Sequence, residues 1–203
     1  MVKSFEPQVR ERIRQDLLEK GRELFAIYGL KKTSVEDIAT RVGISKGSFY
    51  NFFRSKEELF FEIVEEEEHF RDSLLSELIN SANDTRSALK QMFARALEIV
   101  DDNKIMEKLY QPGVYEHLLR KIPAEKLSIH QANDWQAATA FIEHFQQQGN
   151  LRPVTPEIMT GLFRAFFLIT LHKAEVGMEI YPQVMELLID ALSKGLVTEG
   201  ETE

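Results

Sequence analysis

The chain has 203 residues, 43% of them hydrophobic and none of them cysteine, which is enough to bury a core and excludes disulfides and thiolate metal sites. Residues 1–14 are charged throughout and no apolar run approaches the roughly 20 residues of a membrane span, so we expect a soluble cytoplasmic protein with no membrane partner. The net charge of −8 does not exclude a nucleic-acid partner, because residues 1–56 hold 12 Lys and Arg against 7 Asp and Glu, a net charge of +5, and the remaining residues carry −13.

The first predicted helix begins after Pro7 and runs to Tyr28, and Gly29 ends it. Its apolar residues trace one stripe, on which Gly21 marks a place where a second helix could pass closely. The stripe contains Val9, Ile13, Leu17, Gly21, Leu24 and Tyr28. We interpret this helix as a support for the elements that follow, with the three arginines of residues 10–14 either contacting phosphates or simply solvated.

Residues 33–59 contain the signals for two short helices joined by a tight turn. Thr33 with Glu36, and Ser55 with Glu58, fit the S/T-x-x-E capping box, in which each side chain satisfies a backbone N–H that the first helical turn leaves unpaired. The first helix stops at Gly43, the residue best able to take a left-handed conformation. Its apolar face is formed by Val35, Ile38, Ala39 and Val42.

The second of these helices opens at Ser45, a third candidate N-cap, and shows polar groups outward. Phe49 and Phe53 lie four residues apart and can anchor it inward. Its exposed first turns carry Lys46, Gly47, Ser48, Tyr50 and Asn51. One cation, several hydrogen-bonding side chains and a glycine that lets the backbone approach closely suit a DNA major groove. The alternative is a helical hairpin with a polar outer face, which periodicity alone leaves open.

A longer helix follows from Ser55 and links the basic part of the chain to the acidic body. Its apolar residues are Leu59, Ile63, Phe70, Leu74 and Leu78. Four consecutive carboxylates, Glu65 to Glu68, precede His69 and could suggest a metal site. Because they point around the whole helix rather than converging, we interpret them as a solvated face and expect no metal.

The acidic body continues as a series of helices separated by turn signals. The predicted elements are a helix over 89–100 broken at 101–103, short pieces at 104–110 and 114–121 split by Pro112-Gly113, and a helix that follows Pro123 and runs to Gln148, where Gly149-Asn150 stops it.

The last two predicted helices, 156–175 and 181–197, each carry two apolar stripes, whereas one core needs a single stripe. A second copy of the chain is the simplest partner for the extra stripe. We predict a homodimer interface at Met159, Phe163, Phe167, Leu171, Met185 and Ile189. The alternative is a pair of helices buried centrally within one subunit.

Residues 33–59 resemble the DNA-binding domain of the TetR family of transcriptional regulators. The family's run is close to T-[ST]-V-x-x-I-A-x-x-x-G-[VI]-S-x-G-x-[LF]-Y-x-[YH]-F-x-[SN]-K-E-x-L, matched here by Thr33, Ser34, Val35, Ile38, Ala39, Gly43, Ile44, Ser45, Gly47, Phe49, Tyr50, Phe53, Ser55, Lys56, Glu57 and Leu59. Upstream, Leu24-Phe25-Ala26 and Gly29 match the family's first helix. Phe49 and Phe52 stand where leucine and tyrosine or histidine are common. The resemblance covers about a quarter of the chain.

The resemblance implies an all-α fold of about nine helices, with a helix-turn-helix DNA-binding domain at residues 1–54 and a helical ligand-binding and dimerisation domain at residues 55–203. The candidate DNA-binding residues are Thr33, Ser34, Ser45, Lys46, Gly47, Ser48, Tyr50, Asn51 and Lys56. In this family the helices of the body surround a cavity, for which the candidate lining residues are Phe93, Met106, Tyr110, His117, Trp135 and Phe141. Plain core packing is the alternative role of each.

No catalytic pattern emerges, since the sequence contains no HExxH, G-x-S-x-G, Walker or Rossmann motif, and we expect neither an enzyme nor a cofactor. The expected function is a repressor that binds a palindromic operator in double-stranded DNA as a homodimer and is released by a small, largely apolar effector. The alternative is a DNA-bound regulator whose body recognises another protein and binds no small molecule.

Overall fold

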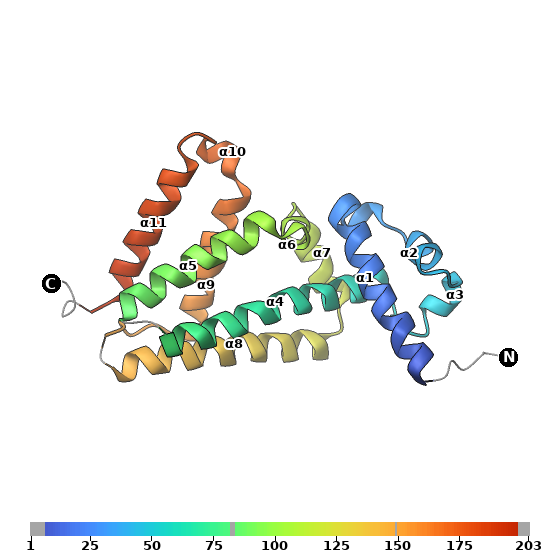
Figure 1. Cartoon of the computed structure of the whole chain (residues 1–203), viewed down its shortest axis with the longest axis horizontal. Helices are drawn as coiled ribbons and strands as arrows, with labels where there is room; N and C mark the ends of the chain where they lie inside the picture. The colour runs from blue at the N-terminus through green and yellow to red at the C-terminus, as the bar shows by residue number, and fades with distance from the viewer. Residues whose placement is uncertain (1–6, 82–83, 149, 199–203) are drawn as a thin grey trace. The chain divides into compact units, whose positions relative to one another are not determined.

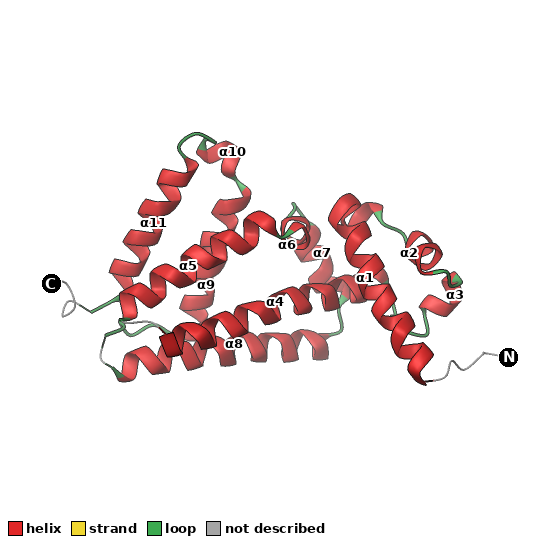
Figure 2. Cartoon of the chain, in the orientation of Figure 1, coloured by secondary structure: helices red, strands yellow, loops and turns green. Residues whose placement is uncertain are grey.

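The computed structural model describes residues 7–81, 84–148 and 150–198, and its regular structure is helical (Figures 1 and 2). Within these ranges the one pairing of extended backbone is an isolated antiparallel bridge between Leu151 and Val197. The all-α fold class is therefore confirmed. The described residues form two compact units, one of residues 7–67 with 104–124 and the other of residues 68–103 with 125–198. The functional division at residue 55 stays a prediction.

The first unit combines the amino-terminal helices with a short segment from the middle of the chain. It contains α1 (Pro7–Lys32), α2 (Val35–Val42), α3 (Lys46–Phe49), the beginning of α4 (Lys56–Ser81), α6 (Lys104–Leu109) and α7 (Val114–Lys121). α1 packs against both α2 and α6, and α2 packs against α3. The predicted end of the first helix at Gly29 is confirmed as a break with φ 76°, after which a last helical stretch reaches Lys32.

Gly21 is the point at which α1 meets α4. A Cβ atom at this position would lie 2.9 Å from Leu59 Cδ2 and 3.3 Å from Ile63 Cδ1, and both of these side chains are fully buried. The predicted close approach of a second helix is thus confirmed. The predicted apolar stripe is packed only in its middle part, because Val9 and Tyr28 at its two ends are exposed.

The second unit is built around α5. It contains the rest of α4, α5 (Thr85–Asp102), nearly all of α8 (Ala124–Gln147), α9 (Pro156–Leu171), α10 (Lys173–Val176) and α11 (Tyr181–Leu196). α5 packs against α9 and α11. Phe93 of α5 is fully buried, with its ring centroid 4.9 Å from that of Phe163 and 5.1 Å from that of Phe166. α5 runs through Asp102, so the break predicted at 101–103 is confined to one residue.

The predicted dimer residues of α9 and α11 differ in burial within the single chain, and their place in an interface stays a prediction. Met159 and Met185 are buried in the core of the second unit within a single chain. Phe163 and Ile189 pack against this core, while Phe167 and Leu171 are partly buried. The exposed apolar side chains of the two helices are instead Ile158, Leu168 and Leu187. Spacing alone did not tell which of these apolar residues the chain buries in its own core.

The acidic segment that begins at Glu65 provides ion pairs. Arg22 of α1 binds Glu66 at 2.6 Å and Glu67 at 3.1 Å. The side chains of Glu68 and His69, and those of Phe70, Leu74 and Leu78, lie outside the described residues. Where side chains are described, no three or more His, Asp or Glu gather as a metal site would require. No helix in the described ranges is long and apolar enough to cross a membrane.

Candidate nucleic-acid interface

The start of α2 lies one residue later than predicted. Its N-cap is Ser34, whose hydroxyl accepts a hydrogen bond from Asp37 N at 3.1 Å, while Asp37 Oδ2 accepts one from Ser34 N at 3.0 Å. Ser34 and Asp37 therefore form the capping box, which was predicted one residue earlier, for Thr33 and Glu36. Hydrogen bonds from the Ser34 side chain and backbone lower the pKa of Asp37. An acidic group in the first turn also suits the positive end of the helix dipole.

Thr33 has a different role because it is buried. Its hydroxyl donates to Gly29 O at 2.9 Å, and its backbone N–H donates to the same carbonyl at 3.3 Å. Both bonds pair a carbonyl at the end of α1 that the helix itself leaves unpaired. The contact of Thr33 with DNA stays a prediction, and its burial favours an internal role.

The turn between α2 and α3 has the predicted geometry. Gly43 adopts the left-handed conformation with φ 80°, and its N–H donates to Thr40 O at 3.1 Å. Ser45 then caps α3, accepting a hydrogen bond from Ser48 N at 3.1 Å. This prediction of an N-cap is confirmed.

α3 presents a polar surface supported by two buried rings. Phe49 and Phe53 are buried, as predicted from their spacing. Most of the predicted DNA-reading residues are exposed; this group comprises Ser34, Ser45, Lys46, Gly47, Tyr50 and Asn51, and Ser48 is half-buried. Regular helix ends at Phe49, and Tyr50 and Asn51 lie in the turn that follows. The Tyr50 ring stays 51% exposed although it meets the edge of Phe49 at 5.5 Å between centroids.

Two arginines of α1 hold the turn that follows α3. Arg10 donates to Asn51 O at 3.2 Å, and its guanidinium lies 5.5 Å from the centre of the Phe52 ring. Arg14, one helical turn later, lies 5.6 Å from the centre of the Phe53 ring and pairs with a carboxylate of α4. Phosphate contact and solvation were the two roles predicted for these arginines, and neither includes this packing against the turn after α3. Their i, i+4 spacing opposite two consecutive aromatic residues is the signal that could have found it.

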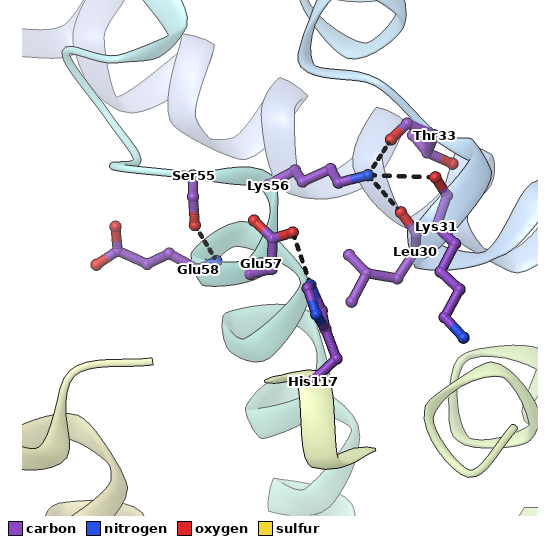
Figure 3. A network of polar contacts seen from close by, with 8 residues as sticks. All are labelled: Leu30, Lys31, Thr33, Ser55, Lys56, Glu57, Glu58 and His117. Atoms are coloured by element: carbon purple, nitrogen blue, oxygen red, sulfur yellow. Dashed lines mark hydrogen bonds and ion pairs between the residues drawn. The ribbon is translucent and has the colours of Figure 1, made fainter. Parts of the chain in front are cut away.

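Lys56, another predicted DNA-binding residue, points into the first unit. Its ammonium group donates to Leu30 O at 2.7 Å, to Thr33 O at 2.8 Å and to Lys31 O at 3.5 Å (Figure 3). A cation at the carboxyl end of α1 pairs carbonyls that the helix leaves free and suits the negative end of its dipole. DNA contact by Lys56 stays a prediction, and the geometry favours a structural role.

At the beginning of α4, one of the two hydrogen bonds predicted for the capping pair Ser55 and Glu58 is present. Ser55 accepts a hydrogen bond from Glu58 N at 3.1 Å, as predicted (Figure 3). Glu58 is buried and accepts a hydrogen bond from Arg54 N at 2.7 Å. In the same turn, Glu57 Oε1 lies 3.2 Å from His117 Nε2 of α7.

The predicted pocket residues fall into both units. Met106, Tyr110 and His117 belong to the first unit, and Phe93 and Phe141 to the second. The side chain of Trp135 lies outside the described residues. Phe93, Met106 and Phe141 are buried, and the Tyr110 ring stacks on Tyr115 at 5.7 Å between centroids. A cavity lined by this set stays a prediction.

The family model described as bacterial regulatory proteins, tetR family, matches residues 17–63. A curated relative, the HTH-type transcriptional repressor KstR2 of Rhodococcus jostii, is 36% identical over 109 residues, which are 52% of this chain and 52% of the relative. The chain thus spans about half the length of this curated relative.

Two solved structures extend the likeness to the whole fold. A TetR-family transcriptional regulator from Pectobacterium atrosepticum superposes with a TM-score of 0.71 at 19% identity, covering 96% of this chain and 99% of that one. KstR2 of Mycobacterium tuberculosis, described as a ketosteroid transcriptional regulator, superposes with a TM-score of 0.58 at 21% identity, covering 92% and 95%. With the capped α2, the left-handed turn and the exposed α3 in residues 33–53, these matches show that residues 17–63 are similar to the amino-terminal region of the tetR family of bacterial regulatory proteins, and that the whole fold is similar to that of TetR-family regulators.

Proposed function

We propose that this protein is a transcriptional repressor that binds an operator in double-stranded DNA through α3 and the turn after it. The observation that carries the proposal is the exposure of Lys46, Gly47, Tyr50 and Asn51 above buried Phe49. A short, capped helix with one cation and several hydrogen-bonding groups suits the major groove. The repressor names of two curated relatives support the direction of regulation.

The operator is a palindrome, and the protein binds it as a homodimer. One α3 contacts too few base pairs to be specific alone, whereas two related by a two-fold axis read half-sites about 34 Å apart. The exposed apolar residues Ile158, Leu168 and Leu187 form the surface for the second copy. Gly161 and Gly195 lie in the same two helices, and a Cβ at either would meet nothing within 4 Å, so a partner helix has room to approach closely.

The effector is a small, largely apolar molecule that binds the form of the protein with low affinity for DNA. It shifts the equilibrium by its differential affinity for the two forms. The aromatic character of Phe93, Tyr110 and Phe141, and the description of one solved relative as a ketosteroid transcriptional regulator, support an apolar ligand. The second candidate is a regulator whose body binds another protein.

DNA binding is tested by fluorescence anisotropy with a duplex from the region upstream of the protein's own gene. We expect salt-dependent binding that Tyr50→Ala weakens about 5- to 160-fold, by loss of roughly 1–3 kcal/mol of base or phosphate contact. Tyr50→Ala should sediment like the wild type, because the predicted dimer surface is in the other unit. Absence of specific binding by the wild type to any upstream fragment would refute the proposal.

The dimer is tested by sedimentation of Leu187→Glu beside the matched variant Ile129→Glu. Leu187 is 70% exposed in α11, and Ile129 is 55% exposed in α8. Both changes add one carboxylate to an exposed site, so neither should unfold the chain. Leu187→Glu should dissociate the dimer and Ile129→Glu should not, because a charge buried at an interface without a partner is costly. If the wild type sediments as a monomer, the proposed homodimer is refuted.

The effector is tested by titrating apolar compounds, starting with ketosteroids, into the complex of protein and upstream DNA. If the protein is a repressor released by an effector, a compound that binds the free protein should also weaken DNA binding. If every bound compound leaves DNA affinity unchanged, the protein-binding alternative is favoured.

A further inference from the structure

Neighbouring residues in the first turn of α4 connect it to two different elements of the first unit. Lys56 binds the carbonyls of Leu30 and Thr33, which flank the corner between α1 and α2. Glu57 binds His117 of α7 (Figure 3). Consecutive residues of a helix project about 100° apart, so the two contacts leave α4 in different directions. One turn of one helix therefore joins the start of the DNA-reading segment to α7.

A second contact ties α1 to the segment before α7. Lys31 donates a hydrogen bond from Nζ to Pro112 O at 3.3 Å. The break at Gly29 lies beside the same segment, since a Cβ there would be 3.8 Å from Lys108 Cδ. Val114 and Leu118 bury the apolar face of α7. α6 and α7 are thus packed into the first unit by apolar contacts and fixed to it by polar ones.

The contact between Glu57 and His117 has the character of a charge-assisted hydrogen bond. The Glu57 side chain is 12% exposed and that of His117 35% exposed. Burial acts to raise the pKa of Glu57, but its own backbone amide, His117 and the charge of Lys56 together hold this pKa below the ordinary value. An ionised carboxylate only accepts hydrogen bonds, so the imidazole donates from Nε2.

We propose that α7 is a positioning element for the operator-reading helices and that His117 is the residue through which it acts. His117 holds Glu57, and Lys56 in the same turn holds the corner from which α2 and α3 follow. Loss of the contact with His117 makes this corner more flexible. A flexible corner must become ordered when α3 binds DNA, and this entropic cost lowers the affinity for the operator. A ligand that draws His117 away from Glu57 lowers operator affinity by the same route. This inference rests on the proposed function for its effect on DNA.

The contact is tested without DNA by hydrogen–deuterium exchange of His117→Ala and His117→Gln. Alanine removes the donor, whereas the glutamine amide restores one. We expect the amides of residues 30–36 and 56–60 to exchange about tenfold faster in His117→Ala, as the loss of one hydrogen bond to a charged group predicts, and to return towards wild-type rates in His117→Gln. His172→Ala is the matched control, because His172 is an exposed histidine of the second unit that lies 3.5 Å from Glu175. It should leave both segments unchanged.

Coupling between the two side chains is tested by the double variant Glu57→Ala, His117→Ala. If the pair acts as proposed, the double variant exchanges no faster than Glu57→Ala alone. Independent, additive effects of the two changes, or wild-type exchange in His117→Ala, would overturn the inference. Should His117→Ala fail to fold, the comparison of Glu57→Ala with the wild type decides the same question.

The effect on function is measured as affinity for the upstream DNA. We expect His117→Ala to bind several-fold more weakly, His117→Gln to recover most of the loss, and His172→Ala to bind as the wild type does. Faster exchange in His117→Ala with unchanged DNA affinity would reject the positioning role. A wild type that binds no upstream DNA would instead refute the proposed function, while the exchange measurement would still test the contact.

Discussion

Replacing Lys56 with methionine distinguishes an internal role from a DNA contact. Methionine keeps most of the apolar stem but removes the ammonium group, so two short hydrogen bonds of 2.7 and 2.8 Å to Leu30 O and Thr33 O are lost. A hydrogen bond to a charged group contributes about 1.5–3 kcal/mol when buried. Lys56 is half-buried and water can reach part of the site, so we expect the free energy of unfolding to fall by about 1–2 kcal/mol in total. For a chain of this size, that lowers the melting temperature by about 2–8 °C.

Lys46→Met is the matched control for this variant. Lys46 is exposed on α3, and no hydrogen bond or ion pair to it is found among the described residues. It should unfold like the wild type by urea titration and calorimetry, and it should lose about one unit of the slope of log affinity against log salt if it contacts a phosphate. Lys56→Met should show the reverse, with lower stability and an unchanged salt slope. Wild-type stability together with a reduced salt slope in Lys56→Met would show that the lysine leaves the carbonyls to bind DNA.

Three further predictions concern backbone approach and charge. Gly21→Ala should lower the free energy of unfolding by about 1 kcal/mol in urea titration, because overpacking against Leu59 costs more than the roughly 1 kcal/mol that alanine usually adds to a helix; a gain in stability would refute the close approach. Gly47→Ala should leave unfolding nearly unchanged, since its Cβ would meet only Ser45 Oγ at 3.8 Å, but should weaken operator binding several-fold in anisotropy. Glu57 has a lowered pKa, so its contribution to stability is present above pH 4.5, its ordinary value, and is lost as the pH falls through the folded-state value. Urea midpoints should therefore fall less steeply below pH 4.5 in Glu57→Gln than in the wild type.

Local hydrogen-bonding chemistry made much of the reading segment predictable. Gly43 and Ser45 act through partners three or four residues away, so the sequence beside them determines the turn and the cap. The start of α2 was harder, because Thr33 with Glu36 and Ser34 with Asp37 are overlapping capping pairs. The choice between them depends on distant residues. Thr33 is held by Gly29 O and by Lys56, which lies 23 positions away.

The network around α7 could not be predicted from local patterns. Glu57 and His117 are 60 residues apart, and nothing in the spacing of either residue indicates the other. Glu57 was matched only as part of the family's run, and His117 was assigned to a pocket because α7 belongs to the body of the chain in sequence. Because α6 and α7 pack into the first unit, His117 lies beside Glu57 in the first turn of α4.

The exposed surface of α9 and α11 shows what helical periodicity does and does not determine. Apolar residues lie around most of α9, so spacing alone does not tell which of them the core buries. The structure buries the face with the bulky side chains of Met159 and Phe166 and exposes the face that includes Gly161. A core is filled best by large side chains, whereas a helix from a second subunit approaches most closely over small ones. If the second copy covers this exposed face, then enlarging Gly161 to leucine should weaken the dimer in sedimentation without lowering the stability of the monomer, while Met159→Ala should do the opposite.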